Sequence, residues 1–199
     1  MAAVGVGARV PVPLPAGVVT RTMVVVRPGV GDVSVSDARS DQAVLSVAWG
    51  EVLMRFTSAE QVWTVLSAFG AVRESLRGVE GNCGGLAMSS GSDEGWGSSV
   101  AAVTWRRPPE WCVVPQSAYD ERRRRTTRWV DVHMGPVLWR VVDWAGYESA
   151  LTVLRNAHRT AVVVFADGGK FRADPSKMDA FTETDAKTPI TPVRRPVPA

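Results

Sequence analysis

Seven arginines lie within 23 consecutive residues of this sequence, interspersed with tryptophans. The arginines are Arg106, Arg107, Arg122, Arg123, Arg124, Arg125 and Arg128; Trp111 lies among them, and Trp105 and Trp129 flank them. Three acidic residues in the same stretch leave a local excess of +4. Guanidinium groups neutralise phosphates and indole rings stack on bases, so this composition is typical of a surface that binds nucleic acid. However, 20 of the chain's 23 basic residues are arginine, and this general bias lowers the weight of any single one.

The outer face predicted for a hairpin near residues 128–142 adds to this cluster. It carries Trp129, Asp131, His133, Leu138 and Arg140. In one interpretation Trp129 and His133 stack on bases, each contributing about 1–3 kcal/mol. In the other, Asp131 lies opposite Arg140 as a surface ion pair that stabilises the sheet by about 0.2–1 kcal/mol, and the tryptophans belong to the core or to a partner interface.

The sequence gives little support for catalysis, metal binding or a phosphate-binding loop. We predict no catalytic residue, no metal site and no cofactor. The histidines are His133 and His158 and the cysteines Cys83 and Cys112, and no pair has the short ligand spacing of a zinc site. Cys112, between two apolar residues, is expected to be buried. There is no GxSxG and no GxxxxGK[ST]. An enzyme with a pocket between two halves remains a third alternative.

The leading hypothesis is therefore a non-enzymatic module that binds DNA or RNA, preferably single-stranded, through an Arg/Trp-rich sheet face. The residues expected to bind are Arg106, Arg107, Arg122, Arg123, Arg124, Arg125, Arg128, Trp129, His133 and Arg140. The alternative hypothesis is a protein-interaction or assembly module, such as a homodimer, with no nucleic-acid role. In that case the same face buries a protein partner.

The composition is that of an ordinary globular protein, with 45% hydrophobic and 22% charged residues in 199. No apolar run approaches the roughly 20 residues that span a bilayer, so we expect no membrane partner. Three prolines, Pro11, Pro13 and Pro15, interrupt the apolar N-terminal stretch and argue against a secretory signal. Two cysteines without a CxxC pairing favour a reducing compartment, and we expect a cytoplasmic protein.

The elements that must position these residues form two similar units, and the predicted class is α+β. Predicted strands at 43–49 and 51–56 precede a helix at 59–77, and strands at 128–134 and 137–142 precede a helix at 144–159. The two units align at an offset of 85 residues, which indicates an internal duplication. The predicted organisation is a disordered arm at 1–21, a first sheet-helix unit at 22–78, a Gly/Ser-rich loop at 79–97, a second sheet-helix unit at 98–173 and a disordered Pro-rich tail at 174–199.

Each hairpin has a two-residue loop that begins with glycine, Gly50 or Gly135, which suits a type II′ turn. This loop length fixes the cross-strand pairs, and all twelve residues of the two predicted inner faces are apolar. They are Leu45, Val47, Trp49, Val52, Met54, Phe56, Val130, Val132, Met134, Val137, Trp139 and Val141. Ser58 and Asp143 fall at the N-cap positions of the two helices.

Further strands are predicted at 22–27, 33–35, 99–106, 111–115 and 161–165, the last returning through 170–172, with a loop or short helical turn at 116–125. Each half would then contain four antiparallel strands followed by a helix. This order of elements resembles that of the Whirly and PUR-repeat families. The resemblance is one of topology only, because the KGKAAL-type motif of the Whirly family is absent. It implies binding of single-stranded nucleic acid.

Overall fold

The computed structural model describes residues 22–79, 101–121 and 124–177. Its elements are β1 (Thr22–Val26), β2 (Gly31–Ser36), β3 (Val44–Trp49), β4 (Val52–Phe56), α1 (Ala59–Ser75), β5 (Ala101–Thr104), β6 (Trp111–Asp120), β7 (Arg125–Met134), β8 (Val137–Val141), α2 (Trp144–Val164) and a 3-10 helix, η1 (Gly168–Lys170). The class is α+β, as predicted. Among the described residues no helix has the length and apolarity needed to cross a membrane.

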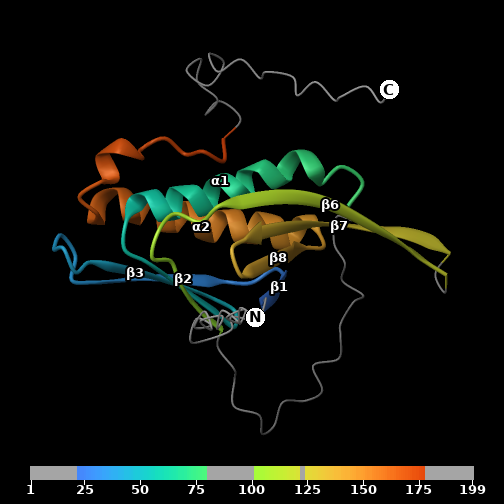
Figure 1. Cartoon of the computed structure of the whole chain (residues 1–199), viewed down its shortest axis with the longest axis horizontal. Coiled ribbons are helices and arrows are strands. Elements are labelled where there is room, and N and C mark those ends of the chain that lie inside the picture. The colour runs from blue at the N-terminus through green and yellow to red at the C-terminus, as the bar shows by residue number, and fades with distance from the viewer. Residues whose placement is uncertain (1–21, 80–100, 122–123, 178–199) are drawn as a thin grey trace, which may run out of the picture.

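The strands form two four-stranded sheets, and each sheet includes a strand from the other half of the chain. One sheet has the order β1-β8-β7-β6 and the other β2-β3-β4-β5. The expectation that each half forms its own antiparallel sheet is wrong, because β1 pairs in parallel with β8 and β5 in parallel with β4. The helices cross over as well: α1 packs on β6 and β7, whereas α2 packs on β2 and β3. Figure 1 shows the two helices side by side above most of the strands.

Both short hairpins have the cross-strand pairs predicted from their two-residue loops. All twelve inner-face residues are buried, none with more than 6% of its surface exposed. Two of them join the sheets, since the rings of Trp49 and Trp139 stack with their centroids 6.4 Å apart. The ring of Phe69 from α1 meets Trp139 edge-on at 5.9 Å. The core is therefore one continuous cluster shared by both halves.

The local signals at turns and helix starts also agree with the structure. Gly50 and Gly135 have φ of 56° and 55°, and the residue after each glycine has a negative φ, as a type II′ turn requires. The hydroxyl of Ser58 accepts from the N–H of Gln61, and the carboxylate of Asp143 accepts from the N–H of Gly146. These side chains satisfy donors that would otherwise lack a partner in the first turn of each helix.

Three predictions about individual segments are wrong. The predicted loop or short helical turn at 116–125 is strand at both ends, because β6 continues to Asp120 and β7 begins at Arg125. The predicted strand at 161–165 is the last turn of α2, since Ala157, His158 and Ala161 continue the buried helical spacing past the β-branched run that suggested a strand. Residues 170–172 form no strand, and η1 occupies their start.

The segment after α2 ties the two helices together. The carboxylate of Asp167 accepts from the N–H groups of Ala59 and Glu60, at 3.0 and 3.1 Å, and so caps α1 from a distance of more than 100 residues along the chain. The guanidinium of Arg155 donates to the hydroxyl of Ser176 at 2.8 Å. Residues 174–177, assigned to the tail from the sequence, thus contact α2, and 178–199 lie outside the described residues.

Tyr147 in α2 is a buried tyrosine whose hydroxyl has no hydrogen-bond partner in the described part of the chain. Burial raises the pKa of Tyr147 to about 12, although Arg73 and Arg155 act in the opposite direction. The unfolded chain loses the phenolic proton near pH 10, so the free energy of unfolding should fall as the pH rises from about 10 to about 12.

We expect Tyr147→Phe to remove about 2 kcal/mol of this alkaline loss, measured by urea unfolding between pH 8 and pH 12. At pH 8 the variant should be as stable as the wild type or slightly more so, because no hydrogen bond is lost. Tyr119→Phe is the control, since the Tyr119 side chain is 63% exposed. An alkaline profile of Tyr147→Phe identical to that of the wild type would contradict the assignment.

Candidate nucleic-acid interface

The β6–β7 pair is longer than its counterpart in the first half. β2 and β3 pair over six residues, from Gly31 opposite Trp49 to Ser36 opposite Val44. β6 and β7 pair over ten, and at the 85-residue offset the additional pairs run from Ser117 opposite Arg128 to Asp120 opposite Arg125. We call residues 117–128 the arm. In Figure 1 the β6–β7 ribbon projects past the ends of both helices.

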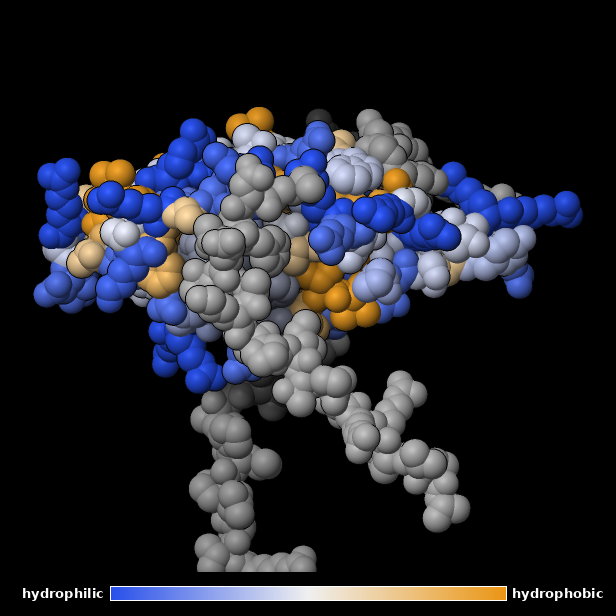
Figure 2. Space-filling view, turned by 90° about the horizontal axis from the view of Figure 1, so that it is seen from above, coloured by the Kyte–Doolittle hydropathy of each residue, from blue (hydrophilic) through white to orange (hydrophobic). Residues whose placement is uncertain are grey.

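The arm lies outside the hydrophobic core. Its exposed residues are Ser117, Ala118, Tyr119, Glu121, Arg124, Arg125, Thr126 and Arg128. Figure 2 shows the projecting end of the molecule, on the right, coloured mostly blue and pale. The two strands are therefore held by their mutual backbone hydrogen bonds and not by an apolar face. Sequence reasoning missed them for this reason, because a polar segment has no alternating pattern.

Two of the predicted arginines present unpaired charges on the arm. Arg124 has a φ of 50° where the chain enters β7, and Arg128 lies where the arm joins the body. Neither side chain makes a hydrogen bond or ion pair with a described residue. The guanidinium of Arg128 lies against Gly78, just after α1. The negative end of the helix dipole stabilises a cation at this position. Arg125 is exposed and lies opposite Asp120, and Arg122 and Arg123 lie outside the described residues.

The outer face of β7 and β8, predicted to stack on bases, is less accessible than base stacking requires. Arg140 donates two hydrogen bonds to the Asp131 carboxylate, at 2.8 and 3.0 Å, and its guanidinium lies 5.0 Å from the centroid of the Trp129 ring. The hydrogen bond to Asp131 raises the pKa of Arg140. The predicted pair is thus confirmed, but its description as a surface pair is wrong, because Asp131 is only 5% exposed. Arg140 therefore covers one face of Trp129.

The other predicted residues do not complete a single patch with the arm. Arg106 and Arg107 are exposed in the connection between β5 and β6. β6 has ten residues, so this connection lies roughly 30 Å from the far end of the strand. His133 is half-buried and has Cys112 as its neighbour across the sheet. Cys112 is exposed, contrary to the expectation that it is buried.

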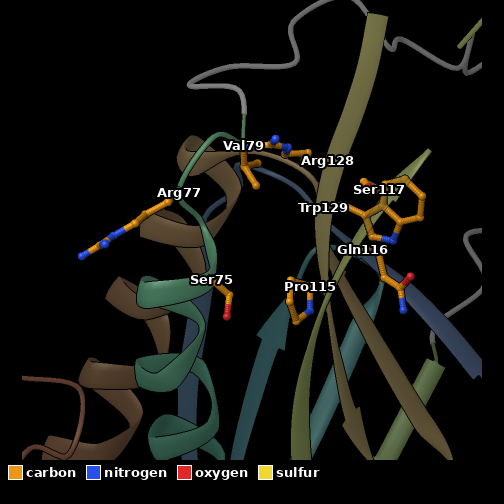
Figure 3. Close-up of a pocket in the computed structure, with 8 residues that line it drawn as sticks. All are labelled: Ser75, Arg77, Val79, Pro115, Gln116, Ser117, Arg128 and Trp129. Atoms are coloured by element: carbon orange, nitrogen blue, oxygen red, sulfur yellow. The ribbon is translucent and has the colours of Figure 1, made fainter. Parts of the chain in front are cut away.

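A hollow of about 230 Å³ lies where the arm leaves the body. Its lining consists of Ser75, Arg77, Val79, Pro115, Gln116, Ser117, Arg128 and Trp129. In Figure 3 the Arg77 guanidinium points away from the strands, and Trp129 lies on the opposite side of β7 from Ser75. The hollow is smaller than the 300–1,000 Å³ typical of small-ligand sites.

The described residues contain no cluster of side chains that could hold a metal ion. Of the two histidines, His158 is buried and its Nε2 lies 2.7 Å from the carbonyl oxygen of Phe171, to which it donates. The arrangement as a whole offers exposed cations on a projecting ribbon.

The chain matches no family model, no curated protein and no solved structure. No activity is therefore transferred from a relative. Any functional assignment depends on the geometry and charge described above.

The Asp131–Arg140 pair should be asymmetric in its contribution to stability. Loss of Arg140 leaves the buried carboxylate of Asp131 without its counter-charge. Loss of the Asp131 charge leaves the guanidinium of Arg140, whose side chain is 31% exposed and can turn to solvent. We expect Arg140→Met to lower the free energy of unfolding by about 3 kcal/mol and Asp131→Asn by about 1 kcal/mol, measured by urea unfolding.

Arg55→Met provides the matched control for this pair. Arg55 occupies the corresponding position of the first hairpin, is exposed and has Ser46 across the strand. Its replacement should change stability by less than about 0.5 kcal/mol. Equal losses for Arg140→Met and Asp131→Asn would refute the asymmetry.

Proposed function

We propose that this protein is a non-enzymatic module that binds nucleic acid through the β6–β7 arm. The observation that carries the proposal is the additional length of this ribbon, which contains no core residue and holds the guanidinium groups of Arg124 and Arg128, neither of which is paired with a described residue. Five arginines against two acidic residues give the arm a formal excess of +3. Charge presented in this way serves contact with phosphates better than it serves stability of the fold.

We further propose that the two halves arose by duplication of a unit of four strands and a helix. The common order of elements, the equivalent glycine turns and the reciprocal exchange of β1 and β5 support this idea. On this view the arm is an addition to the second copy. The resemblance in topology to the Whirly and PUR-repeat families is a further argument for nucleic acid as the ligand.

Replacement of the two unpaired arginines tests the proposal. The double variant Arg124→Ser/Arg128→Ser should bind a labelled oligonucleotide at least about tenfold more weakly at low salt. The slope of the logarithm of affinity against the logarithm of salt concentration should fall by roughly 1.5, since each lost phosphate contact accounts for about 0.7–0.9. Fluorescence anisotropy across a salt series measures both quantities.

The matched control is Arg39→Ser/Arg55→Ser, which removes the same charge from exposed positions of the first half. Arg39 also has a positive φ, of 62°, in the turn that corresponds to the arm. Both double variants should show the thermal melting of the wild type by circular dichroism. Equal weakening by the two would mean that net charge, and not the arm, determines binding.

The second candidate function is assembly, which one surface feature favours. Met23 and Val25 in β1 are apolar residues that are 52% and 37% exposed, next to Leu138 and Arg140 on the outer face of the sheet. If this face joins two copies, light scattering should show a dimer that Met23→Lys converts to a monomer. A monomeric wild type would exclude this candidate. Trp139 cannot contribute to such an interface, because it is completely buried.

A further inference from the structure

We infer that the arm enters the major groove of double-stranded DNA. This inference rests on the proposed function and adds to it the form of the nucleic acid and the place of contact. It depends on the dimensions of the arm, on the side chains of its two faces and on the closed state of the sheet face beside it.

The width of the arm selects the groove. Neighbouring strands lie about 4.8 Å apart, so two strands with their side chains occupy about 10 Å. The major groove of B-form DNA is about 12 Å wide and admits a two-stranded ribbon, whereas the minor groove is about 6 Å wide and does not. The major groove of an RNA duplex is deep and too narrow for such entry, which points to DNA.

The length of the arm also fits. Four residue pairs, from Ser117–Arg128 to Asp120–Arg125, extend beyond the part of the ribbon that matches the first half. At about 3.4 Å per residue they reach roughly 14 Å, which exceeds the groove depth of about 8.5 Å. Arg124 near the tip would then approach base edges, while Arg128 at the root stays level with the phosphates.

The side chains of the arm are short enough for close approach. Ala118 lies opposite Thr127 on one face, and Tyr119 lies opposite Thr126 on the other. Threonine hydroxyls hydrogen-bond to base edges, and alanine and threonine methyl groups contact the thymine methyl. An arginine that reaches the groove floor pairs with guanine through two hydrogen bonds. Ala118, Tyr119 and Thr126 are exposed and Thr127 is half-buried, so each face of the ribbon presents at least one exposed side chain to the walls of the groove.

The neighbouring sheet face favours the duplex over a single strand. Stacking of unpaired bases requires open aromatic faces, with about 1–3 kcal/mol per base. One face of Trp129 is covered by Arg140, and Leu138 on the same side of the sheet is only 8% exposed. Tyr119 is the aromatic residue of the arm and supplies a single ring. Groove entry uses the described residues of both strands of the arm, whereas stacking would use one ring.

The experiment compares the full-length wild type on a labelled duplex of about 20 base pairs and on one of its strands, by anisotropy at low salt. We expect the duplex to bind at least about tenfold more tightly than the strand. Methyl green, which occupies the major groove, should displace the protein, and distamycin, which occupies the minor groove, should not. The reverse pattern of displacement, or tighter binding of the single strand, would overturn the inference and leave the proposed function standing. Failure to bind either oligonucleotide would overturn both.

A graft removes the arm while preserving the scaffold. Residues 117–128 are replaced by residues 37–43, because the flanking pair Gln116–Trp129 corresponds to Ser36–Val44. The graft should melt at the wild-type temperature and lose duplex binding. Duplex binding by a folded graft at wild-type strength would overturn the inference. If the graft does not fold, Arg124→Ser decides, since loss of this exposed tip residue should weaken duplex binding several-fold without a change in melting.

Discussion

The exchange of one strand between the halves is the constraint on which the rest of the structure depends. β1 completes the sheet of β6–β8 and β5 completes the sheet of β2–β4, both through parallel pairing. Parallel neighbours require long connections, so neither sheet can form until distant parts of the chain meet. The stacked rings of Trp49 and Trp139 and the crossed packing of the helices follow from this exchange. The two halves therefore share one core.

This shared core makes the arm conspicuous. The β2–β3 pair ends at Ser36 opposite Val44, whereas β6 and β7 continue for four further pairs that contribute no residue to the core. The Asp131–Arg140–Trp129 group lies at the root of the arm, where a buried carboxylate, a guanidinium and an indole ring hold one another in place. It functions as a rigid base for the ribbon more readily than as a site for a ligand. The proposed binding through the arm would therefore require no change in the scaffold.

The sequence predicted those features that depend on residues close to one another. Gly50 and Gly135 fixed the hairpin registers, and the alternation of apolar residues then determined which face is buried. The exchange of β1 was not predictable in this way, because the run Thr22–Val26 has the same composition whichever strand it pairs with. The arm was missed because polar strands carry no periodic signal. Of the arginines predicted for the site, those that the structure describes are exposed apart from the half-buried Arg140, and their binding role stays a prediction. The burial of Asp131 depends on neighbours from other strands and could not be read from its own strand.

The arm carries a net positive charge, and one of its arginines lies at the end of α1. Adjacent arginines repel one another, and a ribbon without an apolar face gains little from burial to offset this repulsion. Its two acidic residues leave the sequence of the arm with a formal excess of +3. At its root Arg128 meets the end of α1, where the helix dipole stabilises a cation, so the positive charge there is tied to the body of the fold. This positive charge on an exposed ribbon is the feature on which the proposed binding of a polyanion rests.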